Sequence, residues 1–106
     1  MPITSDIRLP RRLAPALEAA AYFLIAEALT NITKHAHATT ATVTVHTRPD
    51  GTLTVIVTDD GHGGADPDGS GLTGLRRRIE ALDGTLTLTS PTGGPTTVQA
   101  EIPCAL

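Results

Sequence analysis

Two stretches of the chain carry apolar residues at helical spacing and predict two amphipathic helices. In the first, from Pro15 to about Ala36, good helix formers dominate and proline suits the first turn. Its apolar stripe consists of Leu17, Ala21, Leu24, Ala28 and Ile32. In the second, "LTGLRRRIEALDG", Gly84 follows where a glycine cap is expected. Its stripe consists of Leu72, Leu75, Ile79 and Leu82.

Four other segments alternate between apolar and polar residues, as half-buried strands do. "TTATVTVHTR" and "TLTVIVT" flank the turn "RPDG" and predict an antiparallel hairpin. "TLTLTS" and "TTVQAEIP" flank "PTGG" and predict another. The order helix, hairpin, glycine-rich loop, helix, hairpin shows no βαβ alternation, and two helices can cover only one face of a sheet. We therefore expect an α/β fold, a two-layer sandwich of a mixed, mainly antiparallel sheet covered on one face by helices.

Length and composition allow one domain of 106 residues, whose core must consist of Leu, Ile, Val and Ala because aromatic residues are scarce. Residues 1–12 hold two prolines and three arginines without a clear period, so we interpret them as a lead-in or linker stub, and residues 13–106 as the domain. The net charge of -3 and the lack of a basic stripe argue against nucleic acid. The single cysteine, Cys104, excludes an internal disulfide. Without a signal-peptide core or an apolar stretch of roughly 20 residues, we expect a cytoplasmic domain that makes no membrane contact.

Polar residues interrupt the first helix at Glu27, Asn31 and Lys34, with His35 next to the lysine. Spacings of four and three place Glu27, Asn31, and Lys34 or His35, on one helix face, each within reach of the next. An acid, an amide oxygen and a cation in line suit a site that positions a water, coordinates Mg²⁺ and meets a phosphate. Helices also expose polar faces as a rule, and spacing alone favours that plainer interpretation.

The segment "DDGHGGADPDGSG" follows the second strand and is too rich in Gly, Asp and Pro for regular structure. Two carboxylates beside bare backbone suit a metal ion, a polar ligand or a simple turn. We expect its first residue, Asp59, to be an exposed loop acid that contributes little to stability.

Three motifs in order, "EALTNITKHA", "DDGHGG" and "GSGLTGLRRRI", resemble those of the ATP-binding catalytic domain of sensor histidine kinases. That domain belongs to the superfamily shared with DNA gyrase, the MutL mismatch-repair proteins and a heat-shock chaperone, and has the Bergerat-type ATP-binding fold. The chain is most similar to the branch with a short ATP lid, whose kinases serve response regulators with helix-turn-helix output domains. The resemblance covers about residues 13–103.

The resemblance implies roles for the polar row of the first helix. Asn31 matches the asparagine of the N box that binds Mg²⁺, and Glu27 matches the acid of that box, which is the candidate catalytic residue. In hydrolytic members of the superfamily this glutamate activates water, whereas in the kinases the nucleophile is a histidine. Lys34 and His35 match the end of the box and are expected near the phosphates.

The glycine-rich segments match the G1 and G2 boxes. In the first, Asp59 is expected to accept a hydrogen bond from the adenine amino group, while Gly61 and Gly63 let backbone approach the nucleotide. Asp60 stands where the family often has asparagine, which we interpret as a tolerated departure. In the second, backbone N–H groups at the start of a helix favour phosphate oxygens. The expected nucleotide-binding residues of this box are Gly69, Gly71, Leu72 and Gly74.

Two further assignments are weaker. "GGPTTV" resembles the terminal strand motif in which a threonine, here Thr96, touches the adenine pocket, although Pro95 replaces the usual glycine. Three arginines on the second helix fit a solvated face, although one could lean toward phosphate or a partner domain. These are Arg76, Arg77 and Arg78.

By resemblance, the domain binds ATP and Mg²⁺ and transfers the γ-phosphate to a histidine of a helical dimerisation domain, upstream of a response regulator. The chain shows no helical hairpin with such a histidine, so we expect it to bind nucleotide without phosphorylating itself. It would lie in the cytoplasm or on the cytoplasmic side of a membrane-anchored sensor. Two alternatives stay open: a stand-alone serine kinase of the anti-sigma-factor type, and a nucleotide-sensing module without transfer activity.

Overall fold

The computed structural model describes residues 3–9, 13–31, 39–61, 70–91 and 93–103, and within them five strands and two helices follow one another. In chain order they are β1 (Ile3–Arg8), α1 (Pro15–Asn31), β2 (Ala41–Thr47), β3 (Thr52–Asp59), α2 (Ser70–Glu80), β4 (Thr85–Thr89) and β5 (Thr96–Pro103). None of the helices in this described part is long and apolar enough to cross a membrane.

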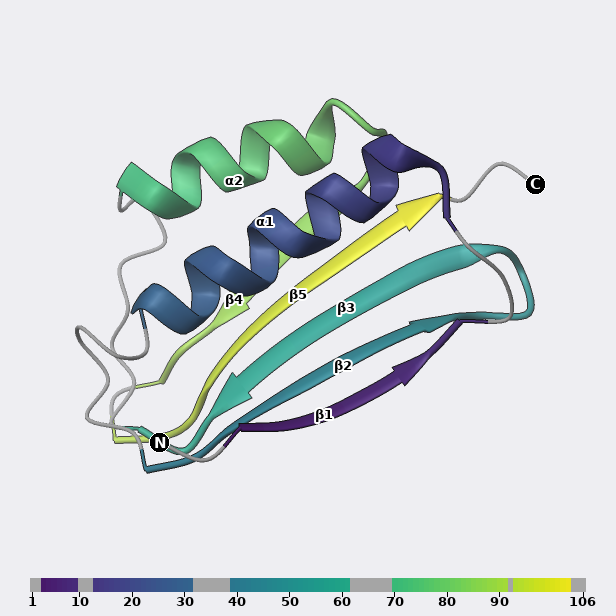
Figure 1. Ribbon diagram of the computed structural model, residues 1–106. Coiled ribbons are helices and arrows are strands. Elements are labelled where there is room, and N and C mark those ends of the chain that lie inside the picture. The colour runs from purple at the N-terminus through teal and green to yellow at the C-terminus, as the bar shows by residue number, and fades with distance from the viewer. Residues whose placement is uncertain (1–2, 10–12, 32–38, 62–69, 92, 104–106) are drawn as a thin grey trace.

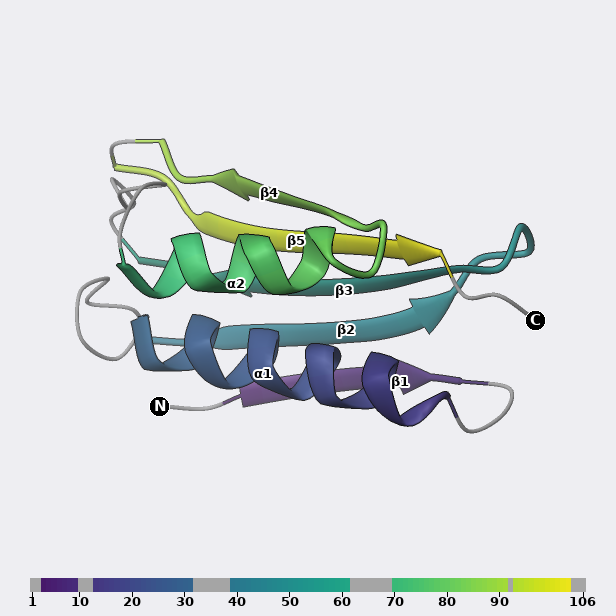
Figure 2. The same cartoon turned by 90° about the horizontal axis from the view of Figure 1, so that it is seen from above.

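The strands form one sheet in the order β1-β2-β3-β5-β4. β2 pairs with β3, β3 with β5 and β5 with β4 in antiparallel fashion, whereas β1 runs parallel to β2. Both helices lie on the same face of this sheet and run in opposite directions (Figure 1). Seen from above, α1 lies on the side of β1 and β2, and α2 on the side of β3 to β5 (Figure 2). The predicted two-layer sandwich with a mixed, mainly antiparallel sheet is confirmed.

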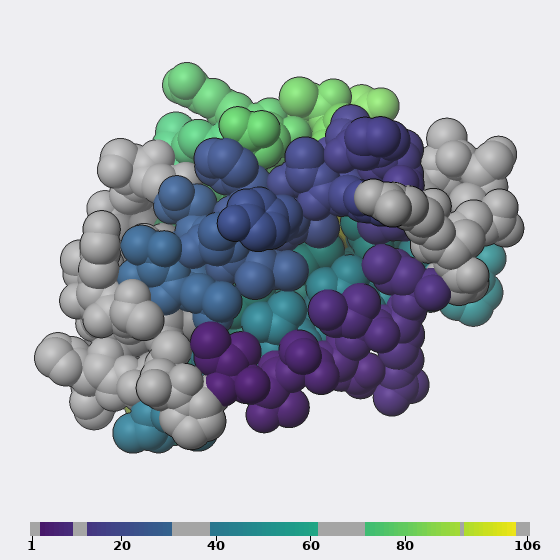
Figure 3. Space-filling model, viewed as in Figure 1, coloured from purple at the N-terminus to yellow at the C-terminus, as the bar shows by residue number. Residues whose placement is uncertain are grey.

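β1 corrects the sequence-based interpretation of the first twelve residues. Residues 3–8 are no irregular lead-in but an edge strand, with Ile3 opposite Ala41 and Arg8 opposite His46. Every residue of β1 is exposed, and Ile3 and Ile7 leave 50% and 60% of their surface open. Figure 3 shows this strand at the lower border of the molecule, beside α1. The sheet therefore begins before residue 13.

The core fills the space between the two helices and the covered face of the sheet. As expected, its buried apolar residues are all Ala, Leu, Ile or Val. α1 contributes Ala20, Ala21, Leu24 and Ala28; α2 contributes Leu72, Leu75 and Ile79; the strands contribute Ala41, Val43, Val45, Leu53, Val55, Val57, Leu86, Val98, Ala100 and Ile102. Small alanines on the buried side of α1 bring that helix close to the sheet.

The end of α2 differs in detail from the predicted glycine cap. The Gly84 N–H donates to the Ile79 carbonyl at 3.0 Å and the Asp83 N–H to the Glu80 carbonyl at 3.0 Å, which is the Schellman pattern. The residue in the left-handed region is Asp83, with φ of 61°, rather than Gly84. Glycine is required at 84 for space, because a Cβ there would lie 2.8 Å from the Glu101 carbonyl oxygen.

Candidate functional site

The ends of two strands and two helices meet at one end of the sandwich. β3 ends at Asp59, and β5 begins at Thr96, which is its direct partner in the sheet. The last turn of α1 and the first turn of α2 lie at this same end, because the helices run in opposite directions (Figure 1). The topology thus brings together three of the motifs that are scattered along the sequence.

Asp59 is a buried residue, not the exposed loop acid that the sequence suggested. It is the last residue of β3 and only 3% exposed. Its Oδ1 accepts a hydrogen bond of 2.6 Å from the Gly61 N–H, whereas its Oδ2 is buried without a hydrogen-bond partner among the described residues. Strand alternation explains the burial, since Asp59 continues the covered face that Val55 and Val57 occupy.

A buried oxygen without a donor is costly, and native proteins rarely retain one without a reason. The neighbours of Asp59 in the sheet are Ala41 on β2 and Thr96 on β5. Thr96 is itself buried, and its hydroxyl lies 2.7 Å from that of Ser90. A carboxylate oxygen in such a setting suits a ligand that brings its own donor, such as an exocyclic amino group of a nucleobase.

Asp60 points the opposite way, and both of its carboxylate oxygens accept hydrogen bonds. Its Oδ1 accepts hydrogen bonds from the backbone N–H groups of Thr39 at 2.8 Å and Thr40 at 2.9 Å, and its Oδ2 accepts one from the Thr39 hydroxyl at 2.5 Å. The Thr39 hydroxyl, followed by the two N–H groups, holds the pKa of Asp60 well below its usual range. Sequence reasoning gave this residue no role.

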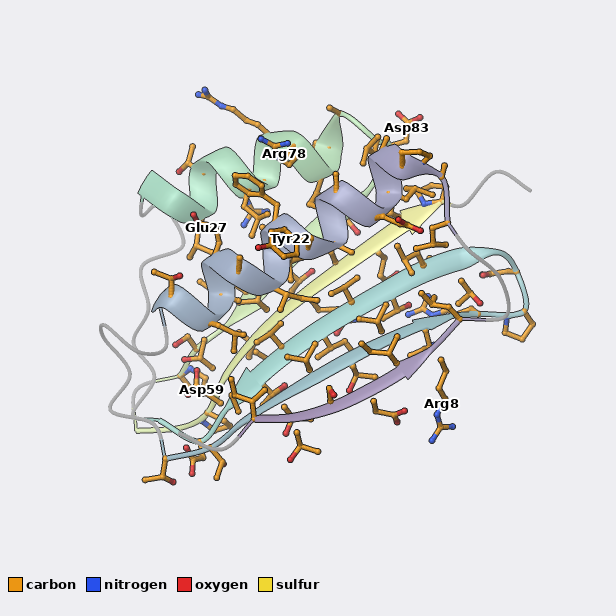
Figure 4. The ribbon with its side chains drawn as sticks, viewed as in Figure 1. Arg8, Tyr22, Glu27, Asp59, Arg78 and Asp83 are labelled. Carbon is orange, nitrogen blue, oxygen red and sulfur yellow. The ribbon has the colours of Figure 1, made fainter. Side chains whose placement is uncertain are left out.

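The polar row of α1 is described in part. Glu27 is half-buried and lies on the side of α1 that faces α2 (Figure 4). Asn31 is the last residue of α1, one turn beyond Glu27, and its side chain lies outside the described part, as do Lys34 and His35. Among the described residues, no three His, Cys, Asp or Glu side chains form a group that could hold a metal ion. Asn31 therefore stays a prediction as the Mg²⁺ ligand.

From Ser70 onward, the G2 box forms the first two turns of α2. Gly71 lies in the first turn, where backbone N–H groups have no partner within the helix. Leu72 is buried in the core, so only its backbone can meet a ligand. Gly74 is exposed, and a Cβ at this position would meet no described atom within 4 Å. Gly63 and Gly69 lie outside the described residues.

The arginines of α2 divide into different roles. The Arg76 guanidinium donates to the Leu86 carbonyl at 2.8 Å and so ties α2 to β4. Arg78 stacks on Phe23 of α1, with its guanidinium carbon 4.1 Å from the ring centroid, a cation–π contact between the two helices. Arg77 is exposed. The predicted solvated face therefore describes only part of this run.

A two-layer α/β sandwich whose buried carboxylate has one oxygen without a partner among the described residues, beside the ends of two helices, fits a nucleotide-binding class of domain. A family model described as histidine kinase-, DNA gyrase B-, and HSP90-like ATPase matches residues 16–106, and the chain belongs to this family. It is an ATP-binding domain of the histidine-kinase type, which confirms the resemblance seen in the sequence.

The curated proteins that resemble the chain in sequence include three kinases or sensors of this type. It is 41% identical over 101 residues to the nitrate/nitrite sensor protein NarQ of Escherichia coli and 41% identical over 80 residues to the histidine-protein kinase/phosphatase UhpB of Salmonella typhimurium. It is 31% identical over 103 residues to the histidine-protein kinase/phosphatase DegS of Bacillus subtilis. These matches cover 91%, 73% and 91% of this chain but only 18%, 15% and 26% of those proteins.

Solved structures agree on the fold. The histidine kinase domain of a blue-light activated kinase from Erythrobacter litoralis superposes with a TM-score of 0.74 at 24% identity, over 96% of this chain and 55% of that one. The histidine kinase AdeS of Acinetobacter baumannii gives 0.70 at 19% identity, over 98% and 55%.

Proposed function

We propose that this domain binds ATP with Mg²⁺ and presents the γ-phosphate to a histidine on a separate helical dimerisation domain, as one step of two-component signalling upstream of a response regulator. The observation that carries the proposal is the buried Oδ2 of Asp59, which has no hydrogen-bond partner among the described residues and lies at the end of the sheet where α1 ends and α2 begins. The names of the relatives, which are sensor and histidine-protein kinases, favour histidine over serine as the acceptor. The domain would lie on the cytoplasmic side of a membrane or free in the cytoplasm.

In this proposal the base and the phosphates are recognised by different elements. Asp59 Oδ2 accepts a hydrogen bond from the adenine amino group, and Thr96 lines the same pocket from β5. Gly61 and Gly63 allow backbone to approach the nucleotide. The N–H groups of the first turn of α2, around Gly71 and Leu72, together with Gly69 and Gly74, receive the phosphates.

The remaining residues of the proposal lie on or after α1. Asn31 would hold Mg²⁺, with Lys34 and His35 near the phosphates; bound Mg²⁺ would neutralise phosphate charge, which is the main requirement of phosphoryl transfer. Glu27 would orient the imidazole, whose nitrogen bonds to the γ-phosphorus as the bond to the departing ADP breaks, and would accept the proton that the imidazole loses. Transfer needs the histidine of the other domain, so the isolated chain is expected to bind nucleotide only.

The test is a calorimetric titration of the chain with ATP and with GTP. Guanine presents a carbonyl oxygen where adenine presents its amino group, so a carboxylate acceptor should bind ATP and reject GTP. Equal affinity for both nucleotides would contradict the assignment of Asp59.

The metal ligand needs its own variant. Asn31→Ala should lose only the Mg²⁺-dependent part of the ATP affinity, so that wild type and variant bind equally in excess chelator. If Mg²⁺ strengthens ATP binding to the same extent in both proteins, Asn31 is not the ligand.

A further inference from the structure

The carboxylate of Asp60 joins two segments of the chain that are 20 residues apart in sequence. Thr39 and Thr40 lead into β2, and Asp60 is the first residue after β3. Three donors from the threonine pair converge on the carboxylate at 2.8, 2.9 and 2.5 Å. In addition, the Asp60 N–H donates to the Thr40 carbonyl at 3.3 Å. The β2–β3 pairing thus continues one residue past its last ladder pair, Ala41 and Asp59.

The place of this connection matters because Asp60 lies between the buried acid and the residue whose N–H holds that acid. Asp59 precedes it, and Gly61, whose N–H fixes Asp59 Oδ1 at 2.6 Å, follows it. A three-residue stretch therefore carries one side chain into the covered layer and one out of the sheet. The outward side chain is hydrogen-bonded to Thr39 and Thr40, which lead into β2, and the inward side chain to Gly61, so the backbone from which Asp59 projects is held on both sides.

The chemistry of the donors explains why an acid serves here. An ionised carboxylate offers acceptors only, and all three groups that face it are donors. The carboxylate is exposed, so it bears little desolvation cost. An asparagine could preserve the same connection, because its oxygen can accept both N–H groups while its amide donates to the Thr39 hydroxyl. Alanine could preserve none of it.

We propose that Asp60 is a positioning residue of the nucleotide site: it clamps the end of β3 to the start of β2 and so fixes Asp59 in the orientation that receives the base. The inference rests on the proposed function, since it assigns to Asp60 a role in ATP binding. Asp60 itself touches no nucleotide in this scheme.

A matched control comes from Asp50, at the opposite end of the same two strands. Its Oδ1 also accepts a backbone N–H, that of Thr52 at 2.9 Å, but this bond closes a local turn two residues long. Asp50→Ala therefore removes a comparable backbone contact without disturbing the site. Any loss of affinity that follows from general loosening of the β2–β3 hairpin will appear in this variant as well.

The experiment compares Asp60→Ala, Asp60→Asn and Asp50→Ala by ATP titration below the melting temperature of each, with and without Mg²⁺. We expect Asp60→Ala to weaken ATP binding about tenfold, the equivalent of losing one or two net hydrogen bonds. Asp60→Asn should recover most of the affinity, and Asp50→Ala should bind as wild type. The loss of ATP affinity should be the same with and without Mg²⁺, because the hydrogen bonds of Asp60 position Asp59, which receives the base, and not the groups that receive the phosphates.

Two results would overturn the proposal: wild-type affinity in Asp60→Ala, or an Asp60→Asn variant as weak as Asp60→Ala. Should Asp60→Ala fail to fold, Thr39→Val removes only the hydroxyl bond, and it should weaken ATP binding about threefold while keeping both N–H contacts; unchanged affinity in Thr39→Val would then count against the clamp. Failure of the wild type to bind ATP would refute the proposed function instead, so the two failures are distinguishable.

Discussion

Replacing Asp59 by asparagine should separate the stability of the nucleotide-free domain from its function. Asparagine has nearly the same shape, and its oxygen can still accept the 2.6 Å hydrogen bond from Gly61. What changes is the buried Oδ2, which has no partner among the described residues. A charged acceptor becomes a neutral amide group, and burial of a neutral group costs less.

The expected changes in the free energy of unfolding and in ATP affinity both follow from the change at Oδ2 of Asp59. Leaving a buried polar atom unpaired costs about 1–3 kcal/mol, more when it is charged. Asp59→Asn should therefore leave the free energy of unfolding unchanged or raise it by about 1 kcal/mol. A hydrogen bond to a charged group contributes about 1.5–3 kcal/mol, so the loss of the acceptor for the adenine amino group should weaken ATP binding about tenfold to a hundredfold.

Urea unfolding without nucleotide measures the first quantity, and calorimetric titration with ATP measures the second. Asp59→Ala is the companion variant, because it also removes the contact to Gly61 and should lose both stability and binding. The reasoning would be refuted if Asp59→Asn destabilised the free domain by more than about 1 kcal/mol and still bound ATP like the wild type. Oδ2 of Asp59 would then be a structural group and not a ligand acceptor.

Other variants test the fold around the site. Gly84→Ala should destabilise the domain by about 1–3 kcal/mol in urea unfolding because its Cβ would lie 2.8 Å from a backbone oxygen, whereas Gly74→Ala, in open space within α2, should raise stability by about 0.5–1 kcal/mol. A double-mutant cycle of Phe23→Leu and Arg78→Ala should give a coupling of about 0.5–1 kcal/mol for the contact between the helices, and no coupling would contradict it. The threonine hydroxyl and N–H groups that bond Asp60 lower its pKa from the ordinary 3.8, so its contribution to stability should be complete above that pH and be lost as the pH falls further. Asp60→Asn should flatten this acid limb in thermal unfolding measured from pH 5 downward, and an unchanged limb would show that the bonds do not form in solution.

Local patterns in the sequence were enough to predict most of the fold. Both hairpins and both helices were expected from periodicity, because hairpin strands pair with their neighbours and each helix buries one stripe. β1 was missed because an edge strand exposed on both faces needs no strict alternation of apolar and polar residues. Its parallel partner, β2, also lies more than thirty residues away in sequence.

The burial of Asp59 could have been read from the sequence. Leu53, Val55 and Val57 occupy every second position of "TLTVIVT", and two residues further the same face reaches Asp59. A carboxylate in an apolar register is a signal of function, whereas its position beside a glycine-rich loop suggested exposure. The bonds of Asp60 could not have been foreseen, because Thr39 and Thr40 become its neighbours only through the register of the sheet.

The two adjacent aspartates thus point to opposite sides of the sheet at the end of β3. Alternation turns Asp59 into the buried layer, where its Oδ2 has no donor among the described residues; such an oxygen is a stronger acceptor and also costs stability. It turns Asp60 outward, where three donors satisfy it and where its charge stays in water. Substitutions at these neighbours should therefore reduce nucleotide binding with opposite effects on the free domain: removing the charge at Asp59 relieves it, and removing the side chain at Asp60 loosens it. A purely structural role for the pair would make both changes destabilising, so the sign of the stability change at Asp59 distinguishes a site built for a ligand from an ordinary turn.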